Sequence, residues 1–236
     1  MATTKNLMPL IPAAGNLPAH LAKSQGLGNE NIGSSDLAVP RINMLQSLSP
    51  QLDESKVEYV EGAKAGRFFN TVTNEVSESI LCLNIYYDHS YVVWRKREFG
   101  GGFIGSFESA QAAANHLATN NMAADQFTVS ETADHYLLLL DDKGGVKGPA
   151  IMSLSSTKLQ MSRQWNSAIQ KACSDNGGLD RFAPGWKLTP VKKSNTKGSW
   201  YVMDFELAGW ASEEQYAMAT QAYENIVAGK EAAKVA

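Results

Sequence analysis

The sequence has no long hydrophobic run and almost no cysteine. Its longest apolar runs, such as Ile151 to Leu154 and Leu137 to Leu140, are far below the ~18 residues that span a bilayer, and its first residues hold no sustained apolar segment typical of a signal peptide. The two cysteines, Cys82 and Cys173, suggest neither a disulfide framework nor a metal site, and each lies in an apolar pattern that indicates a buried side chain. We therefore expect a cytoplasmic protein with no membrane partner.

The sequence also lacks catalytic and cofactor motifs. Its four histidines, His20, His89, His116 and His135, are scattered, and none forms a pair at metal-ligand spacing. The glycine clusters Gly100–Gly102 and Gly144–Gly145 lack the flanking residues of a phosphate-binding loop, and Asp141-Asp142 fits a turn better than a metal site. We predict no catalytic residue, no metal and no cofactor, and we expect that the protein is not an enzyme.

The patterns that are present indicate an ordinary globular protein. With 236 residues, of which 44% are hydrophobic and 19% charged, the chain is long enough for one large domain with extensions. Apolar, β-branched and aromatic residues predict strands at 67–72, 79–87, 91–95, 126–129, 135–140, 149–154, 186–193 and 199–207. Between the second and third of these, Asp88–Ser90 has the length of a tight hairpin turn.

Helical patterns alternate irregularly with these strands. One helix is predicted at 106–119, and another at 155–173, with Trp165 on its core-facing side. A third begins at Ser212, where Gln215 completes a capping box, and ends at Gly229. A single helical turn is expected at 43–48. Together the patterns predict an antiparallel α+β domain built on a sandwich or a barrel, because strands and helices do not alternate as in a parallel sheet.

The positive charge is concentrated in one segment of an acidic chain. From Lys143 to Lys197 there are ten basic and two acidic side chains, a formal charge of +8, while the remaining residues carry −11 and the whole chain −3. Such asymmetry favours a basic surface that binds an anionic polymer.

Aromatic residues interleave with cations in a way that suits single-stranded nucleic acid, which needs cations along its backbone and aromatic faces on which bases stack. Three stretches carry the candidate binding residues. They are Trp94, Arg95, Lys96, Arg97, Phe99 and Phe103 at a strand end; Lys187, Lys192, Lys193, Lys197, Trp200 and Tyr201 on a hairpin; and Lys158 and Arg163 on the helix that follows Ser155–Thr157. No signature of sequence-specific duplex binding is present.

The order of several short motifs resembles a group of bacteriophage single-stranded DNA-binding proteins. The matching pieces are Leu37–Arg41, Gly66–Thr71, Tyr91–Trp94, Pro149–Ile151, Ser155–Leu159, Trp165-Asn166 and Lys197–Tyr201, which together span roughly residues 36–207. The resemblance implies an OB-like β-barrel with inserted helices that coats single strands during DNA replication or recombination. The composition of residues 1–35, rich in Gly, Asn, Ser, Pro and Ala, predicts a flexible N-terminal arm. We expect the OB-like nucleic-acid-binding domain at 36–209, and a C-terminal helix and tail at 210–236.

The C-terminus departs from that group. Many of its members end in a disordered acidic tail that recruits replication proteins, whereas this chain ends in an amphipathic pattern followed by Lys230–Ala236. We therefore expect single-stranded DNA as the main partner, with replication proteins as further candidates. The final helix is expected either to pack on the core or to mediate self-association.

Two other functions fit the same residues. The first is a virion or assembly protein whose basic face contacts another protein. The second is a metal-dependent nucleic-acid enzyme, for which Asp204 and Glu206, alternating on one predicted strand, are the best carboxylate pair. A solvated or ion-paired strand face explains these two carboxylates more simply.

Overall fold

The computed structural model describes residues 19–21, 27–31, 38–196 and 198–235. The chain divides into two units, Met1–Ala38 and Val39–Ala236, and all the strands and helices below lie in the second. The expected N-terminal arm, residues 1–35, falls mostly outside the described residues. Within the second unit the fold is α+β with mainly antiparallel sheets, which confirms the predicted class.

A small three-stranded sheet opens the folded unit. Strands β1 (Ile42–Met44), β2 (Phe68–Asn70) and β3 (Val76–Ser77) pair antiparallel, with the short helix η2 (Pro50–Leu52) between the first two. The helical turn expected at 43–48 is therefore wrong. The backbone of Leu45 instead exchanges hydrogen bonds with Gly66 and Arg67, which extends the pairing of β1 with β2.

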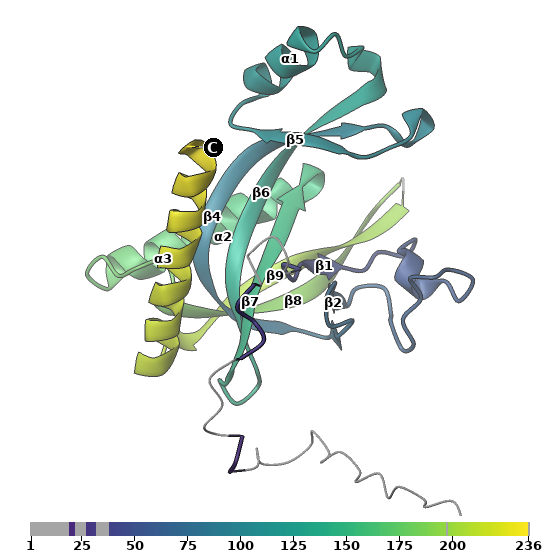
Figure 1. Ribbon diagram of the computed structural model, residues 1–236. Helices are drawn as coiled ribbons and strands as arrows, with labels where there is room; N and C mark the ends of the chain where they lie inside the picture. Colours follow the sequence, from purple (N-terminus) through teal and green to yellow (C-terminus); the bar gives the residue numbers. More distant parts are fainter. Residues whose placement is uncertain (1–18, 22–26, 32–37, 197, 236) are drawn as a thin grey trace, which may run out of the picture. The chain divides into compact units, whose positions relative to one another are not determined.

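The main sheet has six strands. They are β4 (Ile80–Arg95), β5 (Phe103–Phe107), β6 (Phe127–Leu140), β7 (Val146–Ser155), β8 (Pro184–Asn195) and β9 (Gly198–Trp210). The order is β7-β6-β4-β8-β9, and β5 pairs with the far end of β4. β7 and β9 do not pair, so the described strands form an open sheet and no closed barrel is shown (Figure 1).

Strand β4 is continuous through the segment that was expected to turn. Its pairing with β6 runs from Leu81–Leu140 to Arg95–Phe127, so the hairpin predicted at Asp88–Ser90 is wrong. The polar side chains that suggested a turn have partners instead. Asp88 binds Lys230, and His89 lies 3.0 Å from Glu131. A strand can carry such residues on its surface when distant elements neutralise them.

Helices cover the two faces of the main sheet. Helix α2 (Leu159–Asp175) lies on one face, where Trp165 is fully buried in the largest core, as expected from its apolar stripe. Helix α3 (Glu213–Val235) lies on the opposite face, where Ala219 packs in a second core with Leu83 and Leu138. Because both faces are covered near the middle of the sheet, β4 and β6 are apolar on both sides there.

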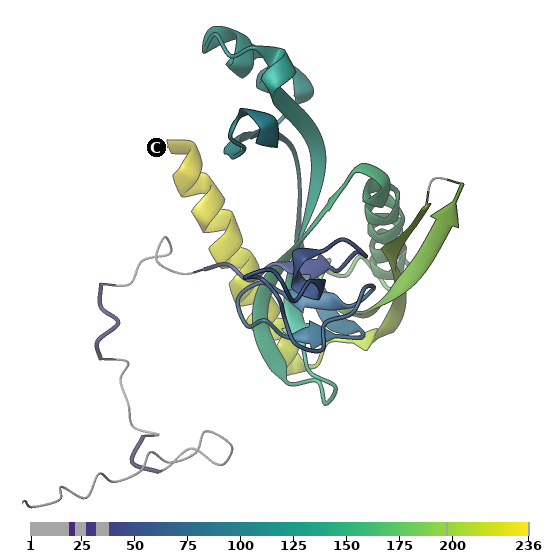
Figure 2. The same ribbon diagram turned by 90° about the vertical axis from the view of Figure 1, so that its right-hand side faces the viewer.

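A third core lies at the far end of β4 and β6. There α1 (Ala110–Thr119) places Ala113 and Leu117 against Val93 and Phe127. We call residues 91–130 the distal lobe; it also contains β5 and the short helices η3 (Arg97–Phe99) and η4 (Ala124–Gln126). Figures 1 and 2 show the lobe extending away from α2 and the small sheet.

The helix ends test local sequence signals. The capping box predicted at Ser212 and Gln215 is confirmed, because each side chain accepts a hydrogen bond from the backbone N–H of the other. The predicted cap at Gly229 is wrong, since α3 continues to Val235. The helix expected from 155 begins with the short helix η5 (Ser156–Lys158), and α2 follows. No helix among the described residues has the length and apolar character to cross a bilayer.

Candidate nucleic-acid interface

An exposed pair of aromatic rings lies on the distal lobe. Trp94 on β4 is directly opposite Phe103 on β5, and their ring centroids are 5.5 Å apart with the ring planes at 69°. The two residues are 46% and 59% exposed, and nearby Phe99 is 42% exposed. Large apolar side chains at this exposure gain little from folding, so a contact with a ligand or a partner is a natural use for them.

The lobe's own core aims this pair outward. Side chains alternate along a strand, so burial of Val93 against α1 directs Trp94 to the other side of the sheet. The turn before β5 consists of Gly100, Gly101 and Gly102, whose φ angles are 97°, 67° and 119°. Residues with a Cβ rarely adopt such angles, so glycine is required for the chain to reverse here.

Three consecutive cations follow Trp94. Arg95 points to the face opposite Trp94, where its guanidinium lies 5.5 Å from the centroid of the Phe127 ring. The backbone of Lys96 bonds to Gln126 and caps the turn of η3. In the described part of the chain, neither these two side chains nor Arg97 forms an ion pair with a carboxylate. Their charge is therefore open to an anionic ligand.

The hairpin of β8 and β9 carries the second group of predicted residues. Lys192 lies opposite Tyr201, and Lys193 opposite Trp200. Both lysines are exposed and neither pairs with a described carboxylate, whereas the two aromatic residues are half-buried. Lys187, lower on β8, lies 3.6 Å from Glu206. Lys197 lies outside the described residues.

Tyr201 has a structural contact as well as a partly exposed ring. Its backbone N–H and carbonyl both bond to the side-chain amide of Gln46, and its ring lies against Gly66. A Cβ at Gly66 would stand 2.5 Å from that ring. Tyr201 therefore holds the small sheet against the hairpin, which leaves Trp200 as the better candidate for stacking.

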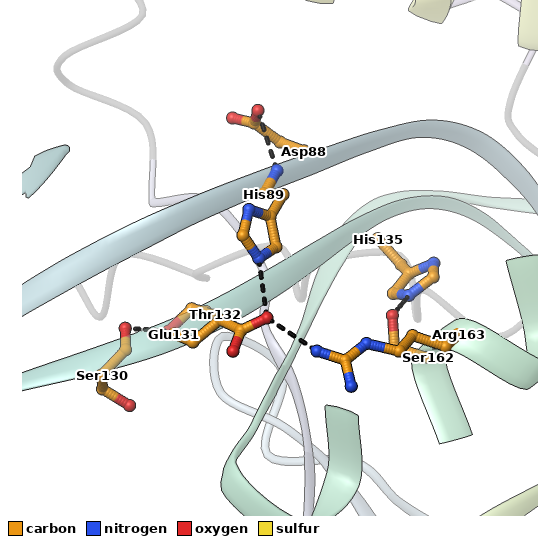
Figure 3. A network of polar contacts seen from close by, with 8 residues as sticks. All are labelled: Asp88, His89, Ser130, Glu131, Thr132, His135, Ser162 and Arg163. Atoms are coloured by element: carbon orange, nitrogen blue, oxygen red, sulfur yellow. Dashed lines mark hydrogen bonds and ion pairs between the residues drawn. The ribbon is translucent and has the colours of Figure 1, made fainter. Parts of the chain in front are cut away.

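The third predicted group, on α2 and the turn before it, is less available. Arg163 donates to Glu131 at 2.9 Å, and Glu131 also meets His89 (Figure 3). The hydrogen bonds from His89 and Arg163 hold the pKa of the Glu131 carboxyl below its ordinary value. Lys158 is half-buried at the edge of a cavity, and burial lowers the pKa of its amine.

Ion pairs neutralise much of the basic segment. Within it, carboxylates hold Arg163, Lys187, Lys147 and Lys171. Figure 2 also separates the tip of the β8–β9 hairpin from the distal lobe, so the two do not form the continuous track that strand ends meeting in a barrel would create. The structure therefore presents two separate patches: Trp94 to Phe103 on the lobe, and Lys192, Lys193 and Trp200 on the hairpin.

A buried polar network lies between β4, β6 and α2, and the sequence patterns did not reveal it. The side chain of His135 bonds at Nδ1 to Asn84 Nδ2 at 2.9 Å and at Nε2 to the Ser162 hydroxyl at 2.8 Å. Arg181 extends the network with bonds to Asn84 Oδ1 and Asn166 Oδ1. The one signal in the sequence is that His135 is the first residue of the predicted apolar strand 135–140, at a position that alternation turns inward.

The distances in this network resemble those of a catalytic serine and histidine, but the protonation state of His135 does not. Arg181 Nε–H needs an acceptor, and in the Asn84 amide only Oδ1 accepts, so Asn84 presents its NH₂ group to His135 Nδ1. The neutral imidazole then carries its proton on Nε2 and donates it to Ser162. Burial lowers the pKa of His135 to about 3. An imidazole that already holds a proton on Nε2 cannot accept one from Ser162, so this serine is not activated as a nucleophile.

The predicted carboxylate pair on β9 does not gain metal ligands. Asp204 and Glu206 are exposed, and Glu206 faces Lys187 across the hairpin. Among the residues that the structure describes, no group of three His, Cys, Asp or Glu side chains could hold a metal ion.

Comparison with known protein families shows to which family the chain belongs. The sequence profile of one family, described as Pam3 phage gp34-like protein, matches residues 12–232. The chain belongs to this family. It is therefore a phage protein, as the resemblance of its motifs indicated in part. No curated protein and no solved structure gives a significant match. The match covers the distal lobe, the hairpin and most of α3.

Proposed function

We propose that this Pam3 phage gp34-like protein binds single-stranded DNA with little sequence preference. The observation that carries the proposal is the exposed pair of Trp94 and Phe103, placed close in the chain to the cations Lys96 and Arg97 on the distal lobe. Exposed rings supply faces on which any base can stack, and unpaired cations next to them attract phosphates.

The expected energies suit a binding protein. Each base stacked on an aromatic ring contributes ~1–3 kcal/mol, and each neutralised phosphate adds a salt-dependent contribution. The hairpin patch supplies further phosphate contacts through Lys192 and Lys193, so a longer strand that reaches both patches gains affinity without base-specific contacts. We propose binding without catalysis, because the protonation of the His135–Ser162 pair does not support a nucleophile.

A virion or assembly role is the second candidate. Two observations favour it: carboxylates neutralise part of the basic segment, and the lobe exposes Val129 in addition to its aromatic rings. An apolar patch with a few cations at its rim also suits an acidic protein surface. This candidate predicts a stable complex with an acidic protein and no affinity for oligonucleotides.

Tryptophan fluorescence distinguishes these functions. Trp94 and Trp210 are similarly exposed, at 46% and 49%, but only Trp94 lies in a proposed patch. Titration with oligo-dT should quench the wild-type protein and the Trp210→Phe variant, and it should quench the Trp94→Phe variant clearly less than either. Substitution to Ala at Trp94 should weaken binding by about 5- to 150-fold, which corresponds to the stacking energy. Absence of quenching, or affinity that does not change with salt, would contradict the proposal.

A further inference from the structure

A cavity separates the small sheet from the main sheet and α2. Its volume is about 230 Å³, and its walls come from β1, β2, β7, β9 and the start of α2. Four methionines, Met44, Met152, Met161 and Met203, line it together with Phe68. Methionine is flexible and polarisable, so a wall of this kind adapts to small apolar groups of differing shape.

One cation lines this cavity. Lys158 is its single charged lining residue; no aspartate or glutamate lines it, and no described carboxylate pairs with Lys158. Burial is the cause that lowers the pKa of this amine, and no neighbouring acid offsets it. A half-buried charge costs stability unless an opposite charge compensates it, so the site favours an added anion.

The local backbone adds to this preference. Lys158 is the residue that precedes α2, and the first turn of that helix contains no acidic side chain. The N-terminal end of a helix carries partial positive charge, so it disfavours the lysine and would stabilise an anion beside it. Polar groups of Ser49, Gln51 and Asn43 at the same cavity can donate further hydrogen bonds.

We propose that the cavity binds a small amphipathic anion, whose carboxylate or phosphate contacts Lys158 and whose apolar part lies among the methionines. The cavity is smaller than a typical drug-sized pocket of ~300–1,000 Å³, so the ligand is compact. Lys158 then belongs to this site rather than to a surface track for DNA. The site does not depend on the proposed single-strand binding, because it shares no residue with either patch.

Calorimetric titration with hexanoate tests the proposal. Wild-type protein should bind hexanoate saturably and at least about tenfold more tightly than hexanol, because only the carboxylate forms a charge-assisted hydrogen bond with the ammonium. Lys158→Met should lose that preference, while Lys171→Met, an exposed lysine on the same helix, should keep it. Equal affinity for the acid and the alcohol, or unchanged hexanoate binding by Lys158→Met, would overturn the proposal.

Further arms separate the possible headgroups and guard against misfolding. Tighter binding of hexyl phosphate than of hexanoate would assign a phosphate monoester, and the reverse a carboxylate. Inorganic phosphate that bound as tightly as hexyl phosphate would refute the amphipathic ligand. If Lys158→Met did not fold, acetylation of wild-type Lys158 followed by mass spectrometry would decide: hexanoate should protect this amine and hexanol should not. Equal acetylation with both would count against the site.

Discussion

The guanidinium of Arg181 donates from Nε to Oδ1 of Asn84, 2.8 Å away, and this bond determines which way the amide of Asn84 faces. The amide NH₂ group is thereby turned to His135 Nδ1, which must accept. The contact between Arg181 and Asn84 thus sets the tautomer of His135. The proton of the neutral ring lies on Nε2, an atom that neither of these two residues contacts.

The tautomer is directly measurable. Long-range ¹H–¹⁵N correlation spectra should show His135 protonated at Nε2 and bare at Nδ1 near neutral pH. Asn84→Asp replaces the donor with an acceptor, so the proton should move to Nδ1 or the ring should become charged. A wild-type ring protonated at Nδ1 would remove the argument against Ser162 as a nucleophile.

The free energy of unfolding should decrease as the pH is lowered through the range where His135 titrates in the unfolded chain. Burial lowers the pKa of His135 from 6.5 to about 3 in the folded protein, so between these values the unfolded state binds the extra proton. The contribution of neutral His135 to the free energy of unfolding is complete above pH 6.5. It decreases as the pH is lowered, by about 1.4 kcal/mol per pH unit for one proton. Denaturant unfolding at several pH values should give a shallower slope for His135→Gln than for His116→Gln. Equal slopes would contradict burial of a neutral His135.

Gly66 should tolerate substitution less well than Gly62, a glycine with a similar positive φ angle. Gly66 and Gly62 have φ angles of 85° and 78°, so alanine strains both by about 1 kcal/mol, but only at Gly66 does the new Cβ meet the Tyr201 ring. Gly66→Ala should therefore cost roughly 1–3 kcal/mol more than Gly62→Ala in chemical denaturation. In a Tyr201→Ala background the difference should disappear, and its persistence would refute the contact.

The hairpin lysines should contribute to DNA affinity but not to stability. The double variant Lys192→Glu, Lys193→Glu should weaken oligo-dT binding and reduce the slope of log K against log salt by about 1.4, because two phosphate contacts are lost. The melting temperature should change little, since both side chains are exposed. Lys143→Glu with Lys171→Glu makes the same change in net charge outside the patches, and equal weakening by this pair would indicate a non-specific charge effect.

Sequence patterns predicted the structure well where it depends on interactions between residues that are close in the chain. The capping box at Ser212 and the buried stripe through Trp165 depend on residues within a few positions, and both are confirmed. The turn expected at Asp88–Ser90 failed because Asp88 meets Lys230, which is 142 residues away in the chain. Because the two partners are far apart in the sequence, local patterns do not show that the charge of Asp88 is neutralised. A polar segment of a strand then has the same pattern as a turn.

The basic segment illustrates the same limit at the candidate site. The formal charge of the segment does not describe its free charge. Glu131 on β6 and Glu206 on β9 form ion pairs with Arg163 and Lys187. The exposure of Trp94 could not be predicted from the sequence either, because it depends on the packing of Val93 against α1. Residue types led to the hypothesis of an anionic ligand, whereas the tertiary contacts decide which of those residues are free to bind one.

The long ladder of β4 with β6, whose register shifts once between Asn84 and Tyr86, also has a mechanical consequence. These two strands contribute to the cores on both faces of the main sheet and continue into the core of the distal lobe. Reorienting the lobe would require breaking backbone hydrogen bonds that hold the middle of the protein together, so lobe and sheet should unfold in one cooperative step. The ring pair at its end is thus preorganised, and a ligand that binds there loses little affinity to ordering the protein.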